Sequence, residues 1–120
     1  MGADHPSTLR TVHNLGLFYA EQGRLADAEP LYHLALAGKE KALGADHVST
    51  LNTVDCLGNL YRNQGRHADA ERLYERALVG YEKALGMDHP STLTTLHNLM
   101  VLYQGRVPEV ENLMKDHHLD

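Results

Sequence analysis

Nine histidines and one cysteine are the side chains of this 120-residue sequence best suited to metal binding or nucleophilic chemistry. Three of the histidines, His5, His47 and His89, recur at intervals of 42 residues, each directly after an aspartate. Residues spaced in this way fall on separate repeats, whereas a structural zinc site needs four converging ligands. The spacing therefore predicts neither a metal site nor a bound cofactor.

Two weaker sites remain as alternatives. The C-terminal sequence brings together Asp116, His117, His118 and Asp120, which could hold a metal weakly. Cys56 could serve as a nucleophile only beside a base that is itself held in place, and its helix face offers no such pair. No glycine-rich phosphate loop is recognisable. An enzyme or metal protein built on the histidines is thus the less favoured interpretation.

The elements that position these side chains belong to an internal repeat. The segments GADH, GADH and GMDH begin at residues 2, 44 and 86, and 28 of 42 positions are identical in the first two units. Self-similarity at such a period is typical of a solenoid, in which each unit packs on its neighbours. We expect a single array over residues 1–120, with repeat one at 2–43, repeat two at 44–85 and a degenerate repeat three at 86–120.

Each unit is predicted to form two helices joined by a glycine turn. Apolar residues at helical spacing indicate helices at about residues 6–21, 25–43 and 67–85. The glycine of each Gln-Gly-Arg turn should adopt a left-handed conformation after the first helix. Pro30 lies near the first turn of the second helix, so we expect it to leave that helix unbroken.

Equivalent apolar residues should form the packed face of the three first helices. The glycine in this face lets a neighbouring helix approach closely, and Met100 is expected to fill the corresponding gap in unit three. The predicted faces are Leu9, Val12, Leu15, Gly16 and Tyr19; Leu51, Val54, Leu57, Gly58 and Tyr61; and Leu93, Leu96, Leu99, Met100 and Tyr103. The second helices should pack through Ala28, Leu31, Tyr32, Ala35 and Leu36, and through Ala70, Leu73, Tyr74, Ala77 and Leu78.

The sequence also predicts how the first helix of each repeat is capped and how the third repeat ends. Asp4, Asp46 and Asp88 are expected to cap the first helices, because aspartate accepts backbone N–H groups there. The third unit has a shortened turn after Tyr103, and a final helix is expected over about residues 108–115.

The composition limits the classes of partner. The formal net charge is −5, which disfavours the phosphate backbone of nucleic acids. No apolar run is long enough to span a membrane, and no leader sequence is recognisable. A single cysteine rules out an internal disulfide and fits a reducing compartment, so we expect a cytoplasmic protein.

The conserved spacing within each unit resembles the tetratricopeptide repeat. The pattern L-G-x-x-Y, Q-G-R and A-D-A-E-x-L-Y-x-x-A-L carries the resemblance. Its residues are Leu15, Gly16, Tyr19, Ala28, Tyr32 and Ala35, then Leu57, Gly58, Tyr61, Ala70, Tyr74 and Ala77. The 42-residue period is similar to the kinesin light chain subclass, and to C-terminal arrays of NACHT and NB-ARC signalling NTPases. This resemblance implies an all-α, right-handed superhelical solenoid of antiparallel helix pairs.

The same resemblance implies a non-enzymatic protein–protein interaction module. First helices of such arrays line a concave groove that holds a peptide or a partner helix. The corresponding positions are Arg10, His13, Asn14, Leu17 and Glu21; Asn52, Asp55, Cys56, Asn59, Arg62 and Asn63; and Thr94, His97, Asn98 and Val101. Asn14 and Asn98 are expected to bond a peptide backbone, although Cys56 takes that place in unit two. The alternatives are a solvated polar face, or a structural fragment of a signalling NTPase.

The ends of the array predict self-association. A solenoid needs polar capping units, because a terminal repeat otherwise leaves an apolar face uncovered. Leu17 and Phe18 lie near one end, and Val107, Val110, Leu113 and Met114 near the other. We therefore expect a homodimer through a terminal repeat, beside binding of a protein or peptide.

Overall fold

The computed structural model describes residues 5–104 of the chain. Its helices are α1 Pro6–Glu21, α2 Leu25–Leu43, α3 Val48–Asn63, α4 His67–Leu85 and α5 Pro90–Gln104. The predicted helices at 6–21, 25–43 and 67–85 are confirmed, and Pro30 lies inside α2 without ending it. The final helix expected at 108–115 lies outside the described residues.

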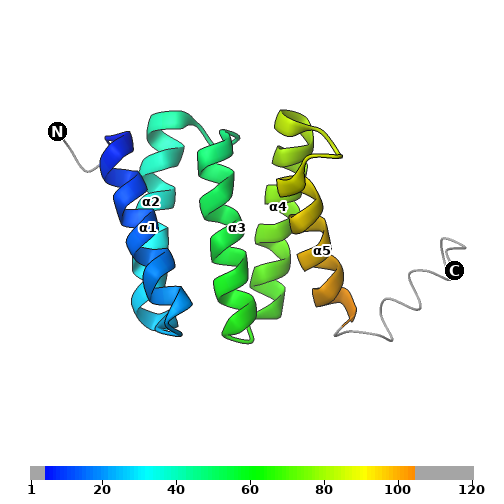
Figure 1. Cartoon of the computed structure of the whole chain (residues 1–120), viewed down its shortest axis with the longest axis horizontal. Coiled ribbons are helices and arrows are strands. Elements are labelled where there is room, and N and C mark those ends of the chain that lie inside the picture. Colours follow the sequence, from blue (N-terminus) through cyan, green and yellow to red (C-terminus); the bar gives the residue numbers. More distant parts are fainter. Residues whose placement is uncertain (1–4, 105–120) are drawn as a thin grey trace, which may run out of the picture.

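The helices run alternately up and down, and each packs on the next one in the sequence (Figure 1). No strand occurs within residues 5–104. In Figure 1, α1 and α5 lie in front of α2 and α4. None of the described helices is long and apolar enough to cross a membrane.

Glycine ends the first helix of each of the first two units. Gly23 has φ 79° and Gly65 has φ 81°, a left-handed backbone that other residues rarely adopt. The N–H of Gly23 donates to the carbonyl of Ala20, and that of Arg24 to the carbonyl of Tyr19. The predicted glycine turns are therefore confirmed, and they reverse the chain within three residues.

Histidine, not aspartate, caps the starts of the first helices. The Nδ1 atom of His47 accepts the N–H of Ser49 at 3.0 Å, because α3 begins at Val48 and His47 is the residue next to it. Equivalent bonds join His5 to Ser7 at 3.2 Å and His89 to Ser91 at 3.1 Å. The expected aspartate caps are thus wrong for Asp46 and Asp88, which lie one residue too early, and Asp4 is outside the described residues.

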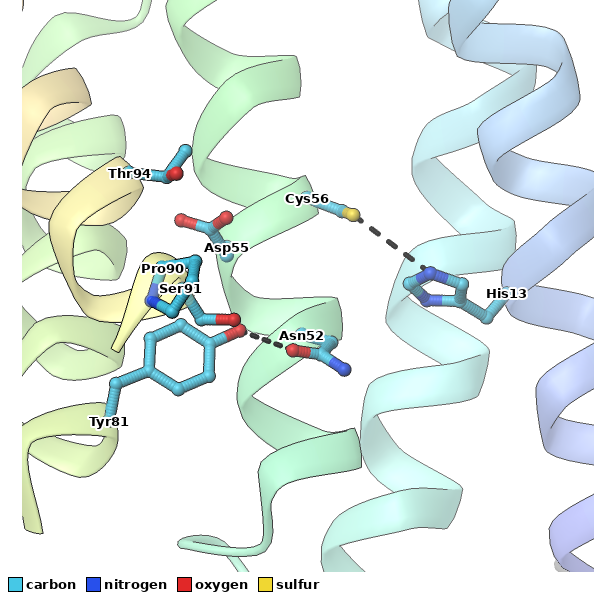
Figure 2. A pocket seen from close by; sticks show the side chains of 8 residues that line it. All are labelled: His13, Asn52, Asp55, Cys56, Tyr81, Pro90, Ser91 and Thr94. Atoms are coloured by element: carbon cyan, nitrogen blue, oxygen red, sulfur yellow. Dashed lines mark hydrogen bonds between the residues drawn. The ribbon is translucent and has the colours of Figure 1, made fainter. Parts of the chain in front are cut away.

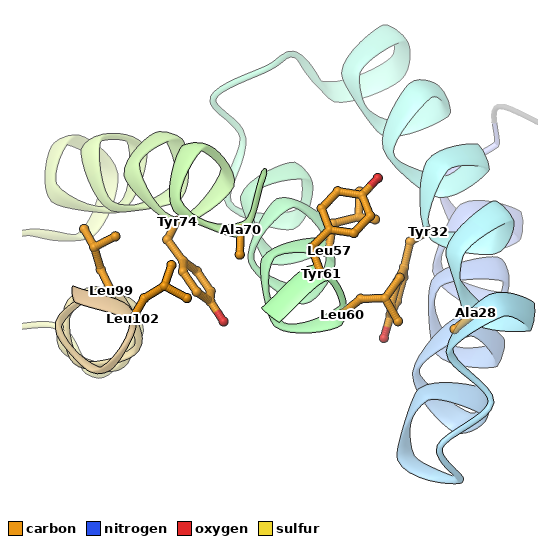
Figure 3. Close-up of a cluster of buried hydrophobic side chains, with 9 residues drawn as sticks. All are labelled: Ala28, Tyr32, Leu57, Leu60, Tyr61, Ala70, Tyr74, Leu99 and Leu102. Atoms are coloured by element: carbon orange, nitrogen blue, oxygen red, sulfur yellow. The ribbon is translucent and has the colours of Figure 1, made fainter. Parts of the chain in front are cut away.

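The central unit holds the main core. Figure 3 shows Leu57, Leu60 and Tyr61 of α3 lying between the second helices of units one and two. Ala28, Tyr32, Ala70 and Tyr74 complete the cluster from α2 and α4, with Leu99 and Leu102 of α5. The predicted faces of α2, α3 and α4 are therefore confirmed, whereas the predicted face of α1 is wrong for Leu15, which is 42% exposed.

Gly58 has no side chain and so allows α3 and α4 to lie close together. A Cβ atom added at Gly58 would lie 2.8 Å from Cε1 of Tyr74, inside van der Waals contact. Met100 takes this place on α5 and is 52% exposed, so it does not fill a gap as expected. Leu93 and Leu96 are also exposed on α5, unlike their buried counterparts on α3. The reason is that no helix in residues 5–104 covers this side of α5.

Polar side chains join the first unit to the second. Glu29 of α2 accepts hydrogen bonds from Nε2 of Gln64 at 3.3 Å and from Arg66 at 3.4 Å. The hydroxyl of Tyr61 lies 2.8 Å from Nε2 of His33. These bonds link α2 to the end of α3, where apolar packing alone would let the two helices slide.

Candidate functional site

Two adjoining pockets open along α3, and Cys56 lines both. The first has a volume of about 420 Å³ and reaches α1, α4 and α5, and the second has about 240 Å³ and reaches α1 and α2. The first is lined by His13, Asn52, Asp55, Cys56, Tyr81, Pro90, Ser91 and Thr94 (Figure 2). The second is lined by Leu17, Ala20, Glu21, Tyr32, Cys56, Asn59, Leu60, Arg62 and Asn63.

Most of the groove residues implied by the family resemblance line these pockets. Asn98 lies beside them and is half-buried. Arg10, Asn14, His97 and Val101 are exposed and line neither pocket. The structure thus brings the groove residues of α3 together with some of those on α1 and α5. Those four exposed residues lie outside both pockets.

Tyr81 orients the amide of Asn52. Its hydroxyl donates a hydrogen bond to Oδ1 of Asn52, as Figure 2 shows. With its oxygen engaged, the amide keeps its Nδ2 group to donate to a ligand. Because Tyr81 is buried in α4, the amide is held from behind by a side chain that cannot move freely.

Asn59 is held in a similar way, one pocket further along α3. Its Oδ1 accepts hydrogen bonds from the hydroxyl of Tyr74 and, at 3.4 Å, from Nδ2 of Asn98. The Nδ2 group of Asn59 is again left to donate. Asn98 therefore supports another asparagine, whereas the family resemblance implied direct contact with a peptide.

A buried lysine sets the tautomer of His13. Lys39 is 4% exposed and donates to Oγ1 of Thr53 at 2.9 Å and to the carbonyl of Ser49 at 3.1 Å. The hydroxyl of Thr53 can then donate to Nδ1 of His13, 2.9 Å away. The ring proton of His13 consequently lies on Nε2, which is 3.9 Å from the Cys56 sulfur (Figure 2).

His13 is a donor that does not change charge near neutral pH. Burial, assisted by the nearby charge of Lys39, lowers the pKa of His13 to about 4. The imidazole is therefore neutral at pH 7, and its Nε2–H group faces the first pocket.

Cys56 has the properties of a structural thiol. Burial and the adjacent carboxylate of Asp55 raise its pKa to about 11. Since the thiolate is the nucleophilic form, a protonated Cys56 is poorly suited to covalent catalysis at neutral pH. Its partner His13 is neutral and cannot stabilise a thiolate as an imidazolium would.

Asp55 is the carboxylate of the first pocket. Its Oδ1 atom accepts a hydrogen bond from the hydroxyl of Thr95 at 3.1 Å. Burial raises the pKa of Asp55, while this hydrogen bond and the charge of Arg62 oppose the rise. No salt bridge to Asp55 is found within residues 5–104. The side chain thus carries its charge, when ionised, without a close counter-ion.

Sequence reasoning missed the buried residues behind the groove. Lys39, Tyr74 and Tyr81, which lie on the second helices, donate hydrogen bonds to side chains of α3. The sequence predicts only Tyr74 among them, and only as a core residue. In the alignment of the two 42-residue repeats, Lys39 occupies the position equivalent to Tyr81. This exchange could have indicated that position 39 is buried, because the equivalent residue of the second repeat is a tyrosine.

The described residues offer no group of ligands for a metal ion. Within residues 5–104, no three His, Cys, Asp or Glu side chains lie close enough together to hold one. The alternative built on residues 116–120 falls outside this range.

Comparison with known sequences then decides the family. Residues 8–49 and 50–91 each match the sequence profile described as Tetratricopeptide repeat. This chain belongs to the tetratricopeptide repeat family. Repeats of this family generally act as protein-interaction modules and typically lack enzymatic activity. The further resemblance to NACHT and NB-ARC proteins stays a prediction.

Solved structures support the same assignment and the kinesin light chain subclass. The array is similar to nearly identical TPR-like repeats of a kinesin light chain-like protein from Podosopora anserina, and to a single-residue variant of that protein. Each comparison has a TM-score of 0.83 and 30% sequence identity, and covers 97% of this chain and 56% of the other. The predicted all-α right-handed solenoid is therefore confirmed. This chain spans little more than half the length of those structures, and no curated protein matches it significantly.

Proposed function

We propose that this repeat array binds an extended peptide segment of a partner protein in the groove along α3. The observation that carries the proposal is the pair of asparagines on α3. Asn52 and Asn59 each have their oxygen engaged by a buried tyrosine of α4, and each keeps an N–H₂ group to donate beside a pocket. Hydrogen-bond donors that are already fixed in place before binding lose little conformational freedom when a ligand binds.

The spacing of the two amides suits an extended main chain. Asn52 and Asn59 are seven positions apart, which corresponds to about 10 Å along a helix. A peptide in the extended polyproline II conformation advances by about 3.1 Å per residue with three residues per turn, so carbonyls three residues apart face the same side and would meet both amides. Main-chain carbonyls are present in every peptide, and selectivity therefore comes from the side chains that enter the pockets.

The remaining groove residues have supporting roles in this proposal. His13 lines the first pocket, with its Nε2–H group directed at the sulfur of Cys56. Leu17 and Leu60 give the second pocket an apolar wall, and Asn98 steadies Asn59. The exposed residues Arg10, Asn14, His97 and Val101 would form the outer edge of the contact.

Peptide selection followed by amide replacement tests this function. A phage-displayed library of random 12-residue peptides is selected on the purified protein, and the dissociation constants of the recovered peptides are measured by fluorescence anisotropy. Replacing Asn52 or Asn59 by alanine removes one hydrogen bond, worth about 0.5–1.5 kcal/mol of binding energy. We expect Asn14→Ala, which lies outside both pockets, to weaken binding less.

Two outcomes would contradict peptide binding in this groove. One is that no peptide is recovered from the library. The other is that peptides are recovered but bind the Asn52→Ala and Asn59→Ala proteins as tightly as the unaltered protein. Thermal melting of each variant serves as the control for folding.

A second candidate function is self-association through α5. Leu93, Leu96 and Met100 lie at helical spacing on α5 and are 49%, 39% and 52% exposed. Apolar residues in one stripe favour contact with another apolar surface. A second copy of the chain is one such surface, and this supports a homodimer. Cys56 is a free thiol and the single cysteine of the sequence, which fits a reducing compartment such as the cytoplasm.

A further inference from the structure

The first pocket has a negative charge that nothing in its walls balances. Asp55 is a carboxylate, and the other lining residues include neither lysine nor arginine. His13 is neutral at pH 7 because its pKa is lowered to about 4. Asn52, Ser91, Thr94 and Tyr81 contribute only neutral polar groups. The pocket therefore has complementary chemistry for a cation.

Burial disfavours the charged form of Asp55, and the hydrogen bond from Thr95 and the charge of Arg62 oppose that effect. Oδ1 accepts the hydrogen bond from Thr95, while Oδ2 accepts none from any group in residues 5–104. A largely buried carboxylate without a close counter-ion is unfavourable, and the raised pKa of Asp55 reflects that burial. An asparagine could accept the same Thr95 bond without the charge. A charged group kept at such a place is typical of a functional site.

We propose that the first pocket receives the ammonium group of a lysine side chain from the bound peptide and pairs it with Asp55. This inference rests on the proposed peptide-binding function and names the side chain that gives the groove its selectivity. The ammonium group has three donors, which can be shared between the free Oδ2 of Asp55 and the hydroxyl oxygens of Ser91 and Thr94. The ring of Tyr81 and Pro90 offer an apolar wall for the lysine methylenes.

Lysine suits this geometry better than arginine. A planar guanidinium pairs best with both oxygens of a carboxylate, and at Oδ1 of Asp55 it would have to share the oxygen with the hydroxyl of Thr95. The compact ammonium group needs only the other oxygen and nearby hydroxyls. The second pocket differs in charge, because it is lined by both Glu21 and Arg62, whereas Asp55 is the single charged side chain lining the first.

The test begins with the 12-residue peptides selected on the unaltered protein. We expect them to share a lysine at one position. Replacing that lysine by norleucine should weaken binding about tenfold, and arginine should fall between the two, as measured by fluorescence anisotropy. Asp55→Asn should reduce the affinity for the lysine peptide to that for the norleucine peptide. Glu82→Gln, an equal loss of charge on the exposed side of α4, should leave the dissociation constant within about twofold.

The outcomes separate this inference from the proposed function. Selected peptides without a shared lysine, or equal affinity of the lysine peptide for the Asp55→Asn protein, would overturn the lysine pocket and leave peptide binding intact. Failure to recover any peptide would overturn both. If Asp55→Asn does not fold, amide NMR shifts of Ser91 and Thr94 in the unaltered protein decide. These amide shifts should differ between the complexes with the lysine and norleucine peptides. Equal shifts would contradict the proposal that the first pocket binds lysine.

Discussion

At the scale of single residues, the groove depends on side chains that lie behind its surface. Tyr81 and Tyr74 engage the side-chain oxygens of Asn52 and Asn59, which under the proposal leaves both N–H₂ groups to donate to a ligand. His13 donates from Nε2 because Thr53, held by Lys39, occupies its Nδ1. Each exposed donor thus has a buried partner on another helix, and a change at the partner should alter binding without touching the ligand.

Asp55 should make the protein less stable as the pH rises. An unfolded aspartate has a pKa of about 3.9, and burial raises the pKa of Asp55 in the folded protein. Ionisation is therefore easier in the unfolded chain, and the contribution of this group to stability falls as the pH rises from about 3.9 through the raised value. We expect Asp55→Asn to increase the free energy of unfolding at pH 7, with a smaller gain in acid, in urea titrations.

Thr95 provides the check on this prediction, because asparagine can still accept its hydrogen bond. If Asp55→Asn is as stable as the unaltered protein at pH 7, or less stable, then the carboxylate does not destabilise the fold. In that case the proposal that it is kept for ligand binding would lose its support.

At the scale of helices, glycine sets how closely the two helices of a unit approach. In the central unit, a Cβ atom added at Gly80 of α4 would lie 2.5 Å from Cδ1 of Leu51, which is buried in α3. Gly38 has the same relation to Leu9 in unit one, at 2.3 Å. The pairing of a small residue with a large one at equivalent places keeps the helices of each unit in register.

Gly80→Ala should therefore destabilise the protein although alanine favours helices. Overpacking a tight contact costs about 1–3 kcal/mol, and the gain in helix propensity is about 1 kcal/mol. We expect a net loss of stability of up to about 2 kcal/mol, seen as a lower urea midpoint. Val79→Ala, on the exposed side of the same helix, should leave the midpoint nearly unchanged. A higher midpoint for Gly80→Ala would mean that α3 and α4 can separate at little cost.

At the scale of the whole molecule, the repeats are similar in sequence but differ in their surroundings. The second unit has neighbours on both sides, and the predicted face of α3 is buried throughout. On α5, Leu93 and Leu96 occupy the places of the buried Leu51 and Val54 but are 49% and 39% exposed. This difference makes α5 the strongest candidate for contact with another apolar surface.

Charged residues on α5 should abolish any self-association. Leu96→Glu places a carboxylate in the apolar stripe, where pairing with a second copy would leave that charge desolvated. We expect light scattering on a sizing column to show a dimer for the unaltered protein at high micromolar concentration and a monomer for the variant. Glu82→Gln is the surface control and should remain dimeric. A monomeric unaltered protein would remove the dimer proposal and leave the peptide groove unaffected.

Local patterns in the amino-acid sequence are enough to predict the helices and their order. The period of 42 residues, the glycine turns and the apolar spacing predicted α1, α2 and α4 to the residue, because these signals are local. The family resemblance also placed His13, Asn52, Asp55 and Asn59 on one groove. Local signals suffice for a solenoid, in which each contact is between neighbouring repeats.

The arrangement of those residues in the groove depends on contacts between helices that are distant in the sequence. The partners of Asn52 and of His13 come from other helices, 29 and 40 residues away in the sequence. The cap at His47 depended on the residue at which α3 begins, and the exposure of Met100 depended on what packs against α5. Hydrogen-bond direction and burial are set by how close two helices lie, and periodicity along one helix carries no information about that distance.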